Sequence, residues 1–144
     1  QGWDEMIVAA IGDTSAPCVL DVDDCLPREV NGDAPLLPIL VGTAAWFRSC
    51  GYFYAPCYVS VYCDNDAAEL AQSHGVVRPA KHIKLKHNYE GHDRDETQRR
   101  SYAQENWERG RVTLEARREA GFPRDPSWWG DLDRGRSESM TGKK

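Results

Sequence analysis

The apolar positions of the chain fall into short runs that polar, turn-forming segments separate. Residues 17–22 form an apolar run with β-branched character, and residues 58–63 (YVSVYC) are rich in aromatic and β-branched side chains. Both runs predict buried strands. Residues 81–86 alternate, with Ile83 and Leu85 on one side and basic side chains on the other. This alternation predicts a third, half-exposed strand.

Longer segments between these runs predict helices. Residues 35–50 are apolar almost all round, which is typical of a buried helix, and Gly51 supplies its stop. The other helical segments are residues 66–74, residues 95–120 and residues 3–12, the last of which also fits a strand.

The order of these elements predicts the class of fold. Strands alternate with helices along the chain, which favours an α/β domain with a partly parallel sheet. We expect a mixed sheet with flanking helices, RNase H-like or Rossmann-like, over residues 1–121. A polar C-terminal tail follows over residues 122–144, in which Trp128 and Trp129 would dock onto the core or onto a protein partner that orders the tail.

Composition narrows the class of protein. The chain has 144 residues, of which 40% are hydrophobic and 28% charged, as expected of a soluble globular protein. It contains no apolar run of the roughly 18 residues that a membrane span needs and no signal peptide, so we expect no membrane partner. The five cysteines include no CxxC pair, which predicts free thiols in a reducing, intracellular compartment. Because the chain begins with Gln1, we expect a processed chain or a fragment.

Charge is distributed unevenly along the chain. Residues 1–77 hold 11 acidic and 2 basic residues, whereas residues 78–144 hold 12 acidic and 16 basic residues. The acidic first part predicts carboxylate chemistry in the core, and the basic second part would face an anion, a nucleic acid or an acidic partner. Solvent exposure alone explains the same distribution equally well.

Three aspartates are the candidate catalytic and metal-binding residues. Asp21 and Asp23 end the first predicted strand, and Asp64 ends the second. Carboxylates on neighbouring strand ends repel one another unless a cation bridges them, and Mg²⁺ prefers oxygen ligands. The pattern therefore predicts a Mg²⁺ site for phosphoryl transfer. The alternative is that Asp64 and Asp66 cap the following helix and that residues 21–24 form a solvated turn.

A first resemblance supports the nuclease prediction. The segments VYCDNDAAELA (61–71) and AKHIKL (80–85) resemble the RNase H domain of Ty1/copia-type retrotransposons, and AAWFR (44–48) and ERGRVTLE (108–115) extend the similarity. The resemblance implies a Mg²⁺-dependent phosphodiester hydrolase that acts on nucleic acid, with Asp64 as a metal-binding catalytic aspartate. Asp21 or Asp23 would supply the second ligand; without it, the domain would be an inactive binding or assembly subunit.

A second resemblance implies a different enzyme. The segment CVLDVDDCL (18–26) resembles the first motif of haloacid-dehalogenase-type phosphatases, in which a strand ends in Asp-x-Asp. The resemblance implies that Asp21 is the nucleophile and Asp23 the general acid. A lysine at 81, 84 or 86, together with Asp131 and Asp133 of GDLDRG, would complete the site.

A basic surface is the candidate nucleic-acid interface. Its residues are Lys81, His82, Lys84 and Lys86, which we expect to contact phosphates. The alternative is an edge strand that its lysines protect from aggregation. His82, His87 and His92 recur every five residues, which fits no single face of a helix or strand, so they are expected to be loop histidines rather than metal ligands.

Overall fold

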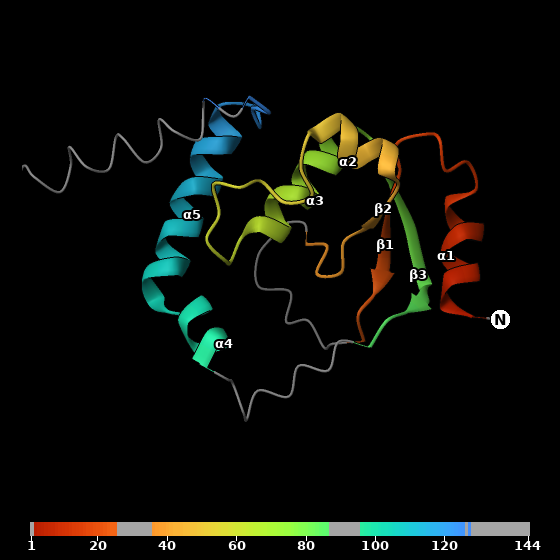
Figure 1. Cartoon of the computed structure of the whole chain (residues 1–144), viewed down its shortest axis with the longest axis horizontal. Coiled ribbons are helices and arrows are strands. Elements are labelled where there is room, and N and C mark those ends of the chain that lie inside the picture. The colour runs from red at the N-terminus through yellow and green to blue at the C-terminus, as the bar shows by residue number, and fades with distance from the viewer. Residues whose placement is uncertain (1, 26–35, 87–95, 126, 128–144) are drawn as a thin grey trace, which may run out of the picture.

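The computed structural model describes residues 2–25, 36–86, 96–125 and 127 (Figure 1). In chain order the elements are α1 (Trp3–Ile11), β1 (Val19–Asp23), β2 (Val41–Gly42), α2 (Ala44–Cys50), α3 (Cys63–Ser73), β3 (Val77–Lys84), α4 (Glu96–Ser101) and α5 (Gln104–Glu119). None of the helices in this part of the chain has the length and apolar character that crossing a membrane would require.

The three strands form one mixed sheet in the order β2-β1-β3. β1 runs antiparallel to β2 and parallel to β3, and Val19 lies opposite Gly42 on one side and Val77 on the other. This arrangement confirms the prediction of a mixed α/β class.

β1 is the centre of the core because helices cover both of its faces (Figure 1). Leu20 and Val22 point toward α1, where they join the apolar cluster that contains Ile11. Val19 points the other way, toward Trp46 of α2 and the apolar side of α3. Burial on both faces explains why Val19, Leu20 and Val22 are all apolar, whereas Asp21 and Asp23 are only partly buried.

β3 is an edge strand that is poorly suited to further strand pairing. The Val19 N–H donates to the carbonyl of Val76. Because backbone groups of successive strand residues point to opposite sides, the N–H and C=O groups of Val77 and the C=O group of Pro79 point away from β1. Pro79 has no N–H to offer at this free edge, and Lys81 is exposed beside it. Both features discourage pairing with another chain.

The alternation predicted for residues 81–86 is confirmed for Ile83 and Leu85, which pack in the same apolar cluster, and is wrong at Lys81. The register of β1 and β3 shifts after the pair Val22–Ala80, so that Asp23 lies opposite Lys84. Lys81 and His82 are consequently both exposed, although they are neighbours in the chain. The irregularity breaks the strict alternation of faces that a regular strand would show.

The predicted strand at residues 58–63 is wrong. Residues 59–62 form turns and bends, and α3 begins at Cys63, three residues earlier than the helix predicted at 66–74. Tyr62 adopts a left-handed conformation with φ of 71°, which no strand residue adopts. The hydroxyl of Tyr58 donates to Asp66 Oδ2 at 3.0 Å. The aromatic residues of this segment therefore pack against helices instead of extending the sheet.

The helix predicted at residues 35–50 is confirmed only from Ala44 onward. Thr43 is its N-cap: Thr43 Oγ1 accepts from the Trp46 N–H at 3.3 Å and from the Cys18 N–H at 3.1 Å. The same hydroxyl donates to the Ala16 carbonyl at 2.8 Å. Thr43 thus caps α2 and also binds Ala16 and Cys18, just before β1. The two residues before it, Val41 and Gly42, pair with β1 as the short strand β2.

The helix predicted at residues 95–120 is divided. α4 ends at Ser101 and α5 begins at Gln104, with Ala103 extended at φ −60° and ψ 144°. The Asn106 amide donates to the Arg100 carbonyl at 2.7 Å, which satisfies an acceptor at the end of α4. Beyond α5, Phe122 packs against the core, so the packed part of the chain extends past residue 121.

Candidate active site

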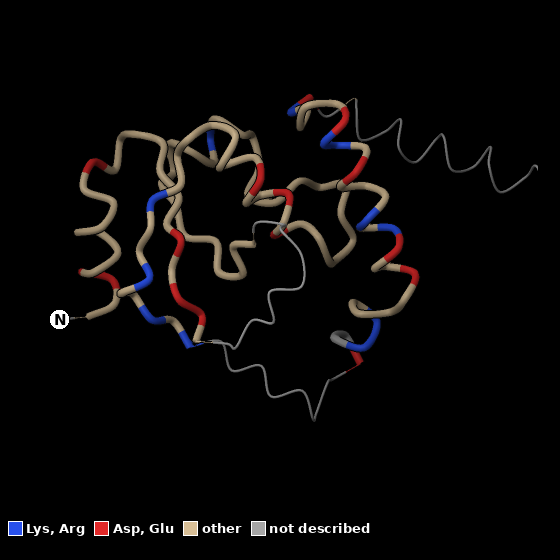
Figure 2. The backbone as a smooth tube through the Cα atoms, turned by 180° about the vertical axis from the view of Figure 1, so that it is seen from behind, with Lys and Arg blue, Asp and Glu red and all other residues tan. Residues whose placement is uncertain are grey.

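The carboxyl end of the β1–β3 pair brings acidic and basic side chains together. Lys81 Nζ lies 2.6 Å from Asp21 Oδ1 and 3.1 Å from the Val22 carbonyl oxygen. Figure 2 shows the acidic part of β1 running beside the basic part of β3. Active sites of parallel sheets form at this end of the strands. Of the residues that the sequence singled out, Asp21 and Lys81 are the pair that the structure joins.

Asp23 lies one strand repeat beyond Asp21, so both side chains leave β1 on the same face. The Asp23 Oδ1 atom accepts from the Cys25 N–H at 2.9 Å, and Cys25 has a left-handed φ of 61°. This hydrogen bond turns the chain sharply just after the strand. Asp24, the next residue, is buried at 3% exposure.

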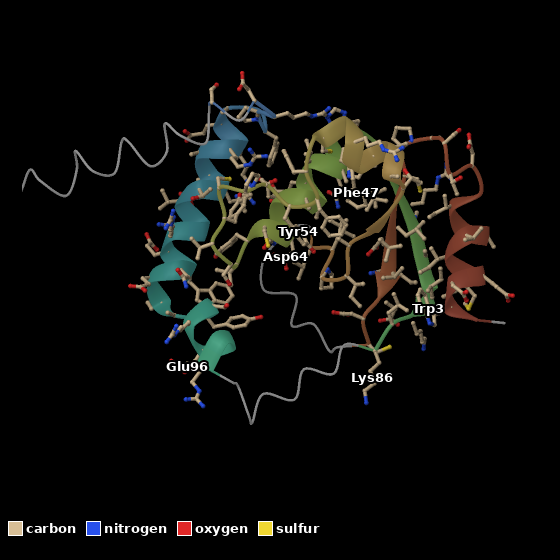
Figure 3. The ribbon with its side chains drawn as sticks, viewed as in Figure 1. Trp3, Phe47, Tyr54, Asp64, Lys86 and Glu96 are labelled. Atoms are coloured by element: carbon tan, nitrogen blue, oxygen red, sulfur yellow. The ribbon has the colours of Figure 1, made fainter. Side chains whose placement is uncertain are left out.

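Asp64 lies elsewhere in the fold than predicted, in the first turn of α3 rather than at the end of a strand. Its Oδ1 atom accepts from the Asn65 N–H at 3.0 Å. Burial raises the pKa of the Asp64 carboxyl, and backbone hydrogen bonds oppose that rise. Figure 3 shows Asp64 close to Tyr54, whose own pKa burial raises to about 12.

The predicted metal centre is not assembled. Among the described residues, no group of three or more His, Cys, Asp or Glu side chains is placed to hold a metal ion, so Asp21, Asp23 and Asp64 form no such group. The reason is the missing strand at 58–63, on which the prediction relied to bring Asp64 beside β1. Because Asp64 is not at a strand end beside β1, the arrangement on which the Mg²⁺ prediction relied is not found, and we derive no reaction step through a metal ion. Asp131 and Asp133 lie outside the described residues.

The candidate nucleic-acid residues Lys81, His82, Lys84 and Lys86 are all exposed. They are not equivalent, because the ammonium group of Lys81 is paired with Asp21. The nearby Arg78 donates to the Ile11 carbonyl at 2.7 Å and so ties β3 to α1. His87 and His92 lie outside the described residues.

A buried ion pair between α3 and α5 was missed by the sequence analysis. Arg117 is 0% exposed and pairs with Asp66, which is 1% exposed. Arg117 Nη2 also donates to the Tyr52 hydroxyl at 2.9 Å, and Nη1 to the Pro123 carbonyl at 2.9 Å. Burial raises the pKa of the Asp66 carboxyl, and the hydrogen bond and charge of Arg117 oppose the rise.

One signal for this pair is present in the sequence. The buried residues of α5 are Gly110, Thr113, Leu114 and Arg117. Their spacing of three and four residues marks a single helix face. An arginine on that face requires a buried acceptor, and Asp66 provides it.

Replacement of Asp64 by asparagine should raise the free energy of unfolding at pH 7. The folded-state pKa of Asp64 is raised by burial, so ionisation destabilises the folded protein as pH rises through the range above about 3.8. Asparagine keeps the acceptor oxygen for Asn65 and carries no charge. The gain should vanish at about pH 3, where the wild-type carboxyl is protonated. Urea unfolding of the wild type and of Asp64→Asn at both pH values measures the difference in stability. Equal stabilities of the two proteins at pH 7 would contradict the prediction.

Comparison with known proteins found no relative of this chain. No family model, curated protein or solved structure matches it.

Proposed function

We propose that the protein is a phosphoester hydrolase that uses Asp21 as its nucleophile, as the resemblance of residues 18–26 to haloacid-dehalogenase-type phosphatases implies. The observation that supports this proposal is the contact of 2.6 Å between Lys81 Nζ and Asp21 Oδ1 at the carboxyl end of parallel strands. A carboxylate nucleophile needs a cation beside it to attract the anionic phosphoryl group. β3 supplies such a cation in the chain position that the resemblance requires.

The proposed reaction has two steps, and each conserves its atoms and protons. In the first, an Asp21 carboxylate oxygen forms a bond to phosphorus while the bond to the leaving oxygen breaks, and Asp23 protonates the leaving group. In the second, water attacks phosphorus, the bond to Asp21 breaks, and Asp23 takes the proton of the water. Lys81 neutralises the phosphoryl oxygens throughout.

A nuclease is the second candidate, with nucleic acid as its substrate. Its support is the resemblance of residues 61–71 to the copia-type RNase H domain and the half-buried carboxyl of Asp64, whose pKa is raised by burial. The exposed cations of β3 would then hold the phosphate backbone. The phosphatase is preferred because Asp21 and Lys81 are in contact, whereas Asp64 lies in the first turn of α3 and not at the end of a strand.

Two asparagine substitutions separate these functions. For the phosphatase, Asp21→Asn should lower the hydrolysis of p-nitrophenyl phosphate by roughly a thousandfold or more, because it removes the nucleophile. Asp64→Asn should leave the rate within about twofold of wild type. Asp4→Asn, an exposed change in the first turn of α1, is the matched control.

The same three variants should be assayed on an RNA–DNA hybrid with Mg²⁺. Loss of hybrid cleavage in Asp64→Asn, with cleavage retained in Asp21→Asn, would replace the phosphatase by the nuclease. If the wild-type protein hydrolyses neither substrate but binds the hybrid, both enzymes are refuted and the domain is a binding module.

A further inference from the structure

The aromatic residues that follow α2 fold back onto that helix. Gly51 ends α2 in a left-handed conformation with φ of 82°, and its N–H donates to the Phe47 carbonyl at 2.9 Å. A turn of this kind reverses the direction of the chain. The ring of Phe53 therefore packs on that of Phe47, with 4.4 Å between the centroids, and the ring of Tyr54 meets Phe53 edge-on at 5.0 Å. We call these three rings the aromatic patch.

The aromatic patch is accessible although the chain on both sides of it is anchored. Phe53 is 51% exposed. Before it, the hydroxyl of Tyr52 accepts from Arg117 Nη2 at 2.9 Å. After Tyr54, Ala55 is buried at 2% exposure. Because both flanks are fixed, a ligand can contact the rings without first ordering this part of the chain.

A carboxyl group without a cationic partner lies beside the aromatic patch. Figure 3 shows Phe47, Tyr54 and Asp64 next to one another between α2 and the start of α3. Burial raises the pKa of Tyr54 to about 12, and the charges of Cys63 and Asp64 add to the rise, so the phenol stays neutral. In the part of the chain that the structure describes, Asp64 forms no ion pair, and only backbone hydrogen bonds oppose the effect of burial on its pKa.

This combination of groups favours an organic cation as ligand. Aromatic faces attract a cation through their quadrupole, and a nearby carboxylate adds a full negative charge. An ammonium group with N–H donors would also need hydrogen-bond acceptors. The phenylalanine rings offer none, and Asp64 Oδ1 already accepts from the Asn65 N–H at 3.0 Å. A quaternary ammonium group has no N–H and surrounds its charge with apolar methyl groups, so it suits these side chains best.

We propose that Phe47, Phe53, Tyr54 and Asp64 bind a small quaternary ammonium compound. Its methyl groups lie on the aromatic patch, and its charge faces the Asp64 carboxylate. The proposal does not depend on the phosphatase, because it uses neither Asp21 nor any residue of β3.

Titration of the full chain with choline, followed by saturation-transfer NMR at constant ionic strength and about pH 8, tests the site. The control ligand is 3,3-dimethylbutan-1-ol, which has the same shape with carbon in place of the charged nitrogen. Choline should bind at least about tenfold more tightly than this alcohol. Ethanolamine, whose N–H groups would lose their water, should bind at least about threefold more weakly than choline. Ring currents should move the choline methyl signal upfield.

Two variants locate the site, and each has a matched control. Phe53→Leu should weaken choline binding about fivefold, and Asp64→Asn about tenfold. Because Asp64→Asn is expected to stabilise the folded protein, a loss of binding in this variant would not reflect unfolding. Trp3→Leu, which removes a ring that is 64% exposed on α1, and Asp4→Asn should bind choline as the wild type does.

Several results would overturn the proposal. It is refuted if choline does not bind, if choline and the neutral alcohol bind equally, or if Phe53→Leu keeps the wild-type affinity. Equal binding of ethanolamine would exclude a quaternary ligand. Loss of the choline signal when Mg²⁺ replaces Na⁺ at the same ionic strength would make an inorganic cation the occupant and refute the proposal as well.

Discussion

Replacement of Arg117 by methionine should lower the free energy of unfolding by about 3–5 kcal/mol, because it leaves the Asp66 carboxylate buried without its partner. Arg117 is 0% and Asp66 1% exposed, so water cannot replace the lost contacts. The substitution also removes the donor to the Tyr52 hydroxyl. Equilibrium unfolding in urea at pH 7 measures the change.

The same two helices provide a matched control. Glu69 of α3 pairs with Arg118 of α5, but the side chain of Arg118 is 43% exposed. Arg118→Met should therefore cost only about 0–1 kcal/mol. Combining Arg117→Met with Asp66→Leu should recover part of the loss, since no unpaired charge then remains. Equal losses from Arg117→Met and Arg118→Met would show that burial does not set the strength of this pair.

Gly110→Ala should also destabilise the protein, by about 1–3 kcal/mol, although alanine is the better helix former by about 1 kcal/mol. A Cβ atom at residue 110 would lie 2.7 Å from Tyr62 Cδ2 and 2.7 Å from the Val61 carbonyl oxygen. The second of these atoms belongs to the backbone, so a side-chain rotation cannot relieve the clash. The segment before α3 would have to move away from α5.

Thermal and urea unfolding of Gly110→Ala, beside Val112→Ala, measure this effect. Val112 lies on the same helix and is 42% exposed, so its replacement should change the stability by less than about 0.5 kcal/mol. An increase in stability for Gly110→Ala would mean that Val61 and Tyr62 do not pack on α5 as described.

The parts of the fold that could be predicted are the strands and helices whose own sequence shows how they are buried. β1 was predicted because residues 17–22 are mostly apolar with β-branched character, which fits burial on both faces, and Leu20 and Val19 indeed pack in opposite directions. The segment 58–63 was mispredicted because aromatic residues favour strands and also loops that pack on helices. Tyr62, whose ring meets Trp107 edge-on at 5.7 Å, belongs to the second kind.

In the candidate site, too, local sequence predicted some features and not others. The acidic end of β1 was visible in the sequence, and its partner was predicted to be a lysine at 81, 84 or 86, but the sequence did not show which of the three it is. Lys81 and Asp21 are 60 residues apart, and the shift of register after Ala80 takes Lys81 out of the simple alternation. Side-chain contacts of this kind depend on pairing between distant strands, which no local pattern of residues encodes.

We expect the pairing of β1 with β3 to form late in folding. The two strands are joined only after about 60 residues of chain have been brought into a loop, a cost in entropy that the first contacts of the ladder do not repay. α2 and α3 lie within that loop and depend on contacts closer in sequence, so we expect them to form before the sheet. We accordingly expect the Asp21–Lys81 contact to be among the last to form. Lengthening the connections inside the loop would slow folding while changing the equilibrium stability by only about 0.6 kcal/mol for each doubling of loop length.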